Sequence, residues 1–354
     1  MSPFSSDIVA VSLVLAATSS ATARIRPSFL LDHVLWEATH IVLATEGEVV
    51  DGRLEVIESW RGDLVEGADL VLPDLAAFSG RDSRRMDRWP ASGAPPRFVT
   101  GSRMLLFLKK AALRPQATKP EVSRWLPASY AGGFKTSVAW IEHGECYGLG
   151  QVENPGPSMI TNVGTEVEFR ARVGAFDAIR SFLDGALAEQ NPSGVAQAIR
   201  TFHKMGFFRA TEKAIEALGG MREHGLPMLR DLASEGAVRR WHWKIVHMMP
   251  RAGGPAVAAD LTDIVREELG YWSWKAPGLK RGWWNNSNER GELREKHMRL
   301  HQALRELKKL RYPACRDVVT QIQYLWRSNS ALRLGKNCEV LQACDGIIRQ
   351  LDEG

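Results

Sequence analysis

The stretch EGEVVDGRLEVIESWRGDL, residues 46–64, decides the fold of the first half of the chain. Its dipeptide DG (51–52) stands between a valine pair and an alternating run, which is a strong local signal for a β-hairpin. In that run Leu54 and Val56 are expected to point into a core, because alternate residues of a strand share a face. The tripeptide RGD (61–63) is expected to be the turn that ends the second strand. The stretch is therefore predicted to be scaffold and not a catalytic site.

The rest of the first half also has the short apolar blocks of β-strands. Between them, residues 76–99 are polar and rich in Pro and Gly, which predicts a long exposed loop. A helical spacing over residues 28–38 precedes the first strand. Short strands without long helices indicate a small β-barrel or sandwich. Further strands are expected in HIVLAT (40–45), ADLVLP (68–73), RMLLFL (103–108) and SVAWIEHGECYGLGQ (137–151), the last holding two strands around a turn at 142–144.

After NPGPS (154–158) the apolar period changes to that of helices. Thr165 and Glu168 form a capping box that opens a helix to about residue 189. A faint internal repeat with a period of about 28 residues indicates helix pairs that stack. The later helices are expected near 193–205, 211–219, 226–235, 237–249, 255–271, 291–311, 313–328 and 337–351.

Two resemblances follow from these patterns. The segments IVLATEGEVVDG, RLEVIESWRGDL, ADLVLP and TGSRMLLFL resemble the TIMP-like or netrin-module OB barrel over about residues 36–110. The segment EALGGMREHGLPMLRDLASEG (216–236) resembles HEAT-like helical repeats. They imply an α+β, two-domain protein, with an OB-like β domain at 24–160 and an all-α repeat or bundle domain at 161–354. The cysteines of the inhibitor family are missing, so metalloprotease inhibition is not implied.

The N-terminus has the pattern of an export signal. An apolar run at residues 8–17 is followed by small residues and by the tripeptide ATA (21–23), which is typical of signal peptidase cleavage. A signal peptide over residues 1–23 would place the protein in the periplasm or outside the cell. Asp7 and the lack of Lys or Arg before the run depart from that pattern, so the alternative is a short buried helix in a cytoplasmic protein. The chain has no apolar run long enough for a membrane span.

Charge and cysteine content narrow the classes of partner. Residues 1–174 have a net charge of −2 and residues 175–354 a net charge of +7. The basic charges are mixed with acidic ones along helices, as in RELKKLR (305–311), so a solvated face is expected rather than a nucleic-acid surface. No cysteine spacing fits zinc, and no cofactor is predicted. In an exported protein, Cys315 is expected to form a disulfide with either Cys338 or Cys344.

The most distinctive segment of the second half is YWSWKAPGLKRGWWNNSNERGEL (271–293). Its aromatic rings, cations and amide suit a carbohydrate or an anionic ligand. The alternative is that the tryptophans close the end of the helical stack and hold a long loop in place. The candidate binding residues are Trp272, Trp274, Lys280, Arg281, Trp283, Trp284 and Asn285.

Other signals for chemistry are weak. His297 and His301 are four apart on a predicted helix and form a candidate metal pair, although partly buried structural histidines are the alternative. No catalytic motif is present, so no catalytic residue is predicted. We expect a non-enzymatic binding or scaffold protein that contacts a protein or an anionic polymer through its helical domain. The alternatives are a hydrolase of cell-wall or polysaccharide substrates with its site between the domains, and an intracellular nucleic-acid binder.

Overall fold

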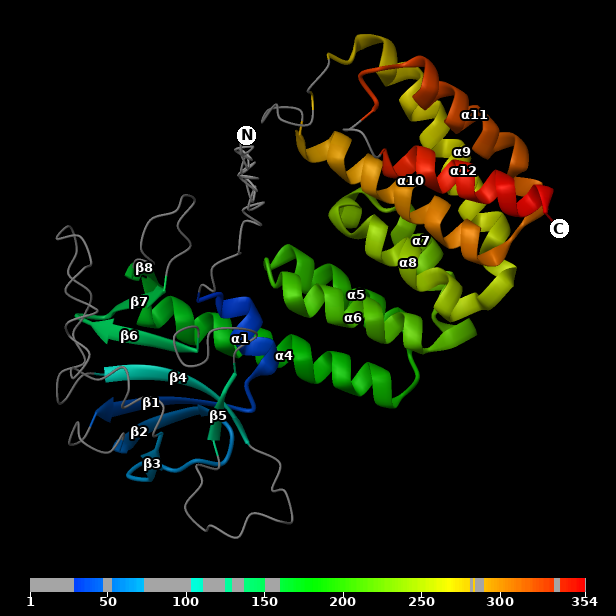
Figure 1. Ribbon diagram of the computed structural model, residues 1–354. Helices are drawn as coiled ribbons and strands as arrows, with labels where there is room; N and C mark the ends of the chain where they lie inside the picture. Colours follow the sequence, from blue (N-terminus) through cyan, green and yellow to red (C-terminus); the bar gives the residue numbers. More distant parts are fainter. Residues whose placement is uncertain are drawn as a thin grey trace, which may run out of the picture.

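A computed structural model describes residues 29–46, 53–72, 103–110, 125–128, 137–149, 160–280, 283, 290–333 and 338–353. An antiparallel sheet forms the N-terminal part and a group of helices forms the C-terminal part, which confirms the predicted α+β layout of two parts (Figure 1). The predicted signal peptide (1–23), the DG turn (51–52) and the loop at 76–99 lie outside the described residues.

The sheet is open and does not close into the predicted OB-like barrel. Among the described residues its edge strands β3 and β8 do not pair, and the strand order is β3-β2-β1-β4-β6-β7-β8, with β5 paired to β4 beside this path. Two of the strands, β5 and β8, were not predicted. The strands are β1 (His40–Glu46), β2 (Arg53–Arg61), β3 (Asp69–Val71), β4 (Arg103–Lys110), β5 (Trp125–Pro127), β6 (Val138–Glu142), β7 (Glu145–Leu149) and β8 (Ile160–Thr165).

Both faces of the central strands are apolar and buried. In β1, Ile41 and Leu43 face the helices, while Val42 and Ala44 face a second core on the other side of the sheet. The two cores therefore lie on opposite faces of the sheet, because successive side chains of a strand alternate between its faces. The prediction for the opening stretch is confirmed in that Leu54 and Val56 are buried, here in the second core.

The helices cover one face of the sheet and continue its core. Helix α1 (Leu31–Glu37) packs against β4 and α6, and apolar residues of α4 join the same cluster of buried side chains as β1 and β4 (Figure 1). The two parts of the chain thus share one hydrophobic core. The remaining helices are α4 (Glu166–Ala188), α5 (Pro192–Lys204), α6 (Phe208–Gly220), α7 (Leu226–Ser234), α8 (His242–Gly253), α9 (Ala258–Lys275), α10 (Arg290–Leu310), α11 (Arg316–Ser328) and α12 (Glu339–Asp352).

The predicted capping box between the two parts is confirmed. The amide of Glu168 donates to Thr165 Oγ1 at 3.2 Å, and the amide of Thr165 donates to the Glu168 carboxylate at 2.8 Å. Strand β8 ends at Thr165 and α4 begins at the next residue, so the sheet extends five residues beyond the predicted domain boundary at 160.

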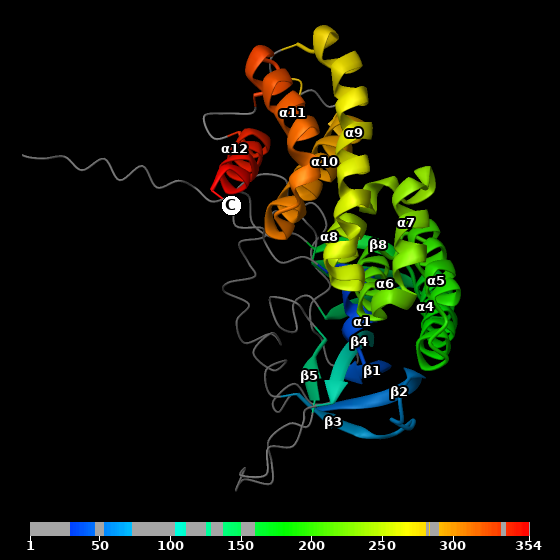
Figure 2. The same cartoon turned by 90° about the vertical axis from the view of Figure 1, so that its right-hand side faces the viewer.

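The helices after α4 pack in two layers. Helices α6, α8, α10 and α12 contact one another in turn, and each also contacts the helix that precedes it in the chain (Figure 2). This is the arrangement expected from stacked helix pairs, because one pair cannot bury its apolar face alone. In the part of the chain that the structure describes, no helix combines the length and the apolar character that a membrane span requires.

The predicted RGD turn at the end of β2 is confirmed. The space around Gly62 in this turn is filled by the His40 ring. Gly62 has a φ of 98°, and a Cβ there would lie 2.1 Å from the His40 ring. That ring cannot move freely, because its Nε2 lies 2.6 Å from Asp63 Oδ1 and its centroid 4.5 Å from that of Trp125. Gly67 has a similar φ of 79°, but a Cβ there would meet nothing within 4 Å.

These two glycines form a matched test of the packing at this turn. Gly67→Ala should cost about 1–2 kcal/mol of unfolding free energy from the positive φ alone. Gly62→Ala should cost about 1–3 kcal/mol more, because the methyl group overpacks against His40. Urea unfolding of both variants measures the difference. Equal costs would show that the His40 contact does not constrain this turn.

Candidate functional site

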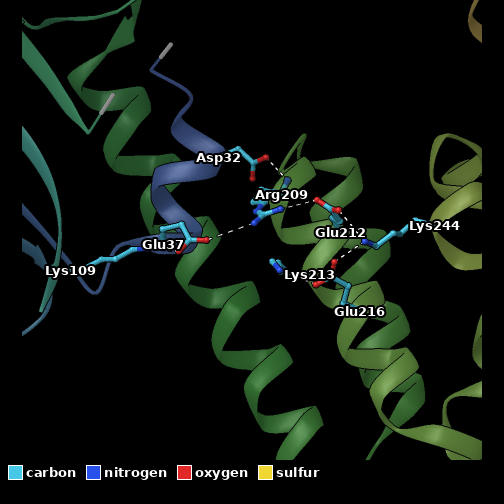
Figure 3. A network of polar contacts seen from close by, with 8 residues as sticks. All are labelled: Asp32, Glu37, Lys109, Arg209, Glu212, Lys213, Glu216 and Lys244. Atoms are coloured by element: carbon cyan, nitrogen blue, oxygen red, sulfur yellow. Dashed lines mark hydrogen bonds and ion pairs between the residues drawn. The ribbon is translucent and has the colours of Figure 1, made fainter. Parts of the chain in front are cut away.

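Charged side chains from four elements meet where the sheet joins the helices (Figure 3). They lie on α1, β4, α6 and α8, and on α6 they are three or four residues apart, which places them on one face of that helix. We call this group the charged stripe. It consists of Glu37, Lys109, Arg209, Glu212, Lys213, Glu216 and Lys244.

The stripe begins at the sheet. Lys109 on β4 donates to Glu37 at the end of α1, and the other oxygen of Glu37 lies 3.9 Å from Arg209 Nη2 on α6. Arg209 Nη1 then donates to Glu212 at 3.0 Å. Burial acts to raise the pKa of Glu37, but the hydrogen bond and charge of Lys109, together with the charges of Arg209 and Lys213, outweigh it and lower that pKa. Glu37 is therefore ionised at neutral pH.

The stripe continues to the next helix of the same layer. Lys244 on α8 donates to Glu212 at 3.1 Å and to Glu216 at 2.7 Å, and Lys213 donates to Glu216 at 2.9 Å. Burial acts to lower the pKa of Lys244, yet its two carboxylate partners raise it. The side chains of the stripe are thus mutually paired and held in fixed positions.

A second polar group connects α8 to α10 in the same layer. His247 Nδ1 lies 3.0 Å from Glu306 Oε1, and Lys309 Nζ donates to the two Glu306 oxygens at 2.8 and 2.9 Å. Glu306 is buried and also accepts from Gln302 at 2.6 Å, while His247 and Lys309 are exposed. Charged groups therefore occur on three successive helices of this layer.

A pocket lies beside the stripe at the junction of sheet and helices. Its volume is about 370 Å³, and it is lined by residues of α1, β8, α4 and the start of α6. Most of its lining is aromatic or aliphatic, including Phe29, Phe169 and Phe208. Two oppositely charged side chains, Asp32 and Arg172, also line it. We call it the junction pocket.

Only one carboxylate oxygen of Asp32 has a structural role, which is to cap helix α6. Its Oδ2 accepts from the backbone amide of Arg209, at the N-terminus of α6, where the N-cap Phe207 provides no side-chain cap. Its Oδ1 is buried and has no hydrogen-bond partner among the described residues. Burial raises the pKa of Asp32, although the Arg209 amide partly opposes this. Such a half-satisfied carboxylate is costly unless something else meets it.

An arrangement that resembles a catalytic triad has a structural explanation. Thr39 Oγ1 lies 2.9 Å from His40 Nδ1, and His40 Nε2 lies near Asp63. However, Thr39 Oγ1 also accepts from the backbone amide of Lys110 at 3.1 Å, which extends the pairing of β1 with β4. The hydroxyl therefore takes part in holding the sheet together and is not directed at an open site.

The structure places the described residues of the predicted Trp-rich loop in different surroundings. Trp272 and Trp283 are buried, with ring centroids 5.8 Å apart, and Trp283 Nε1 donates to Ala331 O at 2.9 Å. Trp274 is 75% exposed, and Lys280 is also exposed. The two buried rings support the alternative that tryptophans hold the loop to the stack. Ligand binding by this segment stays a prediction, and its members Arg281, Trp284 and Asn285 lie outside the described residues.

The predicted metal pair lies on α10, but its members have different partners. The ring centroids of His297 and His301 are 6.5 Å apart; His297 is buried beside Trp272, and His301 lies 3.4 Å from a Glu339 oxygen. Burial, followed by the effect of His301, lowers the pKa of His297 to about 4. Within the described ranges no group of three His, Cys, Asp or Glu side chains is placed to hold a metal ion.

The cysteines are all buried free thiols in this structure. Burial raises the pKa of Cys146 to about 12 and also raises that of Cys344, so neither thiol is activated as a nucleophile. The pairing of Cys315 with Cys338 or Cys344 stays a prediction.

Comparison of the chain with family models, with curated proteins and with solved structures found no match. The charged stripe and the junction pocket were not predicted from the sequence. The only local signal for the stripe was the spacing of Glu and Lys on α6, since the partners on α1, β4 and α8 are distant in the chain.

Two buried histidines should make stability depend on pH. Burial lowers the pKa of both His242 and His297 from 6.5 to about 4, so between these values the unfolded chain binds more protons than the folded one. Stability should therefore fall as pH falls through this window, by about 2 kcal/mol for each histidine at pH 5.

Thermal unfolding at pH 7 and pH 5 checks this expectation. His242→Gln and His297→Gln should each reduce the acid-induced loss of stability, whereas His224→Gln, at an exposed position, should leave it unchanged. A loss of stability that is the same in all three variants would show that these two side chains do not carry it.

Proposed function

We propose that this is a non-enzymatic binding or scaffold protein that contacts a protein or anionic polymer partner through its helical part. The observation that carries the proposal is the row of charged groups across α6, α8 and α10. Side chains that ion pairs already hold in place lose less entropy when a partner binds. Complementary charge gives such a surface specificity and a fast association rate.

The layered packing of the helices supports the same proposal. We take the helix pairs to be HEAT-like repeats, a class whose stacked helices present long binding surfaces. The proposal includes export, with a mature chain that begins at Arg24 in the periplasm or outside the cell. Cell fractionation followed by N-terminal sequencing tests that part independently. The OB-like resemblance adds no support, since the described strands form an open sheet.

The junction pocket is the observation that favours an enzyme as the second candidate. Glycoside hydrolysis usually needs two carboxyl groups that flank the scissile bond. Asp32 is the one carboxylate among the described residues that line this pocket. The pocket is therefore better suited to holding a ligand than to cleaving a polysaccharide, and we favour binding.

We call the layer of α6, α8, α10 and α12 the charged layer, and a double variant tests it directly. Lys213→Gln combined with Lys309→Gln removes two cations from α6 and α10 of this layer. Recovery of the native partner from host extract should fall at least tenfold, and it should also fall for the wild type as salt rises from about 50 to about 300 mM.

The matched control is Arg230→Gln combined with Arg266→Gln, which removes the same charge from α7 and α9. Both arginines form ion pairs with aspartates on the other layer, Arg230 with Asp260 and Arg266 with Asp263. The control should recover the partner as the wild type does. If both double variants recover it equally, the charged layer is not the binding surface.

The two environments of the Trp-rich segment give a further prediction. Trp272→Ala should cost about 3–5 kcal/mol, because it leaves a cavity beside Trp283 and Trp326. Trp274→Ala should change stability by less than about 0.5 kcal/mol, because its ring is exposed. Chemical unfolding measures both. Trp274→Ala also isolates any role of the segment in partner capture, and unchanged capture would exclude this ring as an anchor.

A further inference from the structure

Exposed cations gather where α10 contacts α12 (Figure 1). Arg305 and Lys308 are three residues apart on α10, and the Lys308 side chain reaches α12 at Gly346. Arg349 is three residues beyond Gly346 on α12, so the three cations lie close together. Among the described residues, none of the three side chains forms a hydrogen bond or an ion pair. We call Arg305, Lys308 and Arg349 the basic patch.

The side chain of Lys308 lies against the backbone of α12. A Cβ at Gly346 would be 2.7 Å from Lys308 Nζ, 2.8 Å from its Cε and 3.3 Å from its Cδ. Glycine at position 346 therefore makes room for this side chain, which crosses α12 beside its backbone. A lysine that packs in this way loses less entropy when it binds an anion than one that moves freely in water.

The carboxylates of α10 and α12 pair with other elements. Those of α10 pair with the segment 239–247, and those of α12 pair with α11. The pairs are Glu292 and Glu295 with Arg239, Glu306 with His247, Asp345 with Arg327, and Asp352 with Arg316. The exception is Glu339 at the N-terminal end of α12, which lies 3.4 Å from His301. The C-terminal halves of the two helices therefore present unpaired cations beside each other.

We propose that the basic patch binds a linear polyanion made of phosphate groups. This inference rests on the proposed function, for which it names the class of polymer and the part of the charged layer that holds it. The guanidinium groups of Arg305 and Arg349 donate in a planar fork that fits phosphate oxygens, and Lys308 adds a point charge. Successive phosphates of one chain contact several cations at once, which a single phosphate does not.

The surroundings of the basic patch favour a polymer without bases. Proteins that hold single-stranded nucleic acid stack its bases on aromatic side chains. Among the described residues of α10 and α12, no large hydrophobic side chain is exposed. A chain of phosphates needs only charge and hydrogen-bond donors, and the patch supplies both.

A second role for these cations is to offset the helix dipoles. Lys308 and Arg349 lie in the last turns of their helices, where a positive charge is favourable. That role alone would affect stability and leave polymer binding unchanged. The experiment therefore measures both quantities.

The test is calorimetric titration of the full chain with long-chain inorganic polyphosphate. Saturable binding is expected, and orthophosphate should bind at least tenfold more weakly because it cannot contact all three cations. Single-stranded DNA and heparin, at the same concentration of charge, should also bind more weakly than polyphosphate. Tighter binding of either one would show that the class of polymer is wrong.

A triple variant removes the basic patch. Arg305→Gln, Lys308→Gln and Arg349→Gln together should weaken polyphosphate at least tenfold. The slope of the logarithm of affinity against the logarithm of salt concentration should become shallower by about 2–3, because each lost phosphate contact releases about one counterion fewer. Thermal unfolding of the same variant reports its stability.

The matched control removes the same charge elsewhere. Arg172→Gln, Lys204→Gln and Arg222→Gln replace three exposed cations on α4, on α5 and in the turn after α6. General attraction by a basic protein would be reduced equally by both triple variants. We expect this control to bind polyphosphate within about threefold of the wild type, because its cations lie outside the patch.

A variant without any change of charge tests the placement of Lys308. Gly346→Ala puts a methyl group where the ammonium lies, and the ammonium is the flexible end of its side chain, so it moves and the helix persists. Polyphosphate affinity should fall about threefold or more. Gly270→Ala on α9, where a Cβ meets nothing within 4 Å, should leave it unchanged.

Three further results would overturn the proposal. They are the absence of saturable polyphosphate binding, an equal loss of affinity in the two triple variants, and a patch variant that loses stability but binds as the wild type does. If polyphosphate fails while Lys213→Gln with Lys309→Gln still lowers recovery of the native partner, the proposed function stands and only this inference fails. If polyphosphate binds at the patch while that double variant recovers the partner fully, the proposed surface is the part that fails.

Discussion

The arrangement of sheet and helices depends on the hydrogen bonds that the side chain of Arg61 donates. Its Nη1 donates to the carbonyls of Leu35 and Ala38 at 2.7 and 2.9 Å, at the end of α1, while its other nitrogens donate to Asp177 on α4. One guanidinium thus joins β2, α1 and α4. Arginine suits this task because its donors form a rigid planar fork that can satisfy several acceptors at once. Since Arg61 ends β2 before Gly62 turns the chain, the hairpin also sets where the helices attach.

This attachment gives the two faces of the sheet different cores. Helices α1 and α4 cover one face of β1 and β4, while the buried side chains on the other face come from the strands and the residues that flank them. Further ion pairs follow the same junction: Arg170 on α4 pairs with Glu58 on β2, and Arg103 on β4 pairs with Glu166. With a shared core and these pairs, the two parts of the chain are expected to move little relative to each other.

The features that were predicted correctly are those that local sequence patterns determine. The hairpin strands, the capping box of Thr165 and Glu168 and most helices follow from periodicity and capping, which act over a few residues. Strand β5 was missed because it has three residues and ends in proline, and β8 because its residues are mostly polar or glycine. The OB-like barrel is not confirmed, since the described strands form an open sheet and pairing between distant strands leaves no local pattern. The candidate site was missed for the same reason: Asp32 and the amide that it caps are separated by 177 residues in the chain.

A raised carboxyl pKa does not by itself identify a ligand site, and Glu268 shows why. Burial raises its pKa as it does for Asp32, and its side chain is fully buried. Yet Glu268 Oε1 accepts from Arg299 at 2.8 Å and from Lys296 at 3.3 Å, so its charge is compensated and it holds α9 against α10. Asp32 instead accepts from the backbone amide of Arg209 at the start of α6. Both carboxylates keep one buried oxygen without a hydrogen-bond partner among the described residues, Oε2 of Glu268 and Oδ1 of Asp32. They differ in the partner of the other oxygen, which is a pair of cations for Glu268 and the first turn of α6 for Asp32.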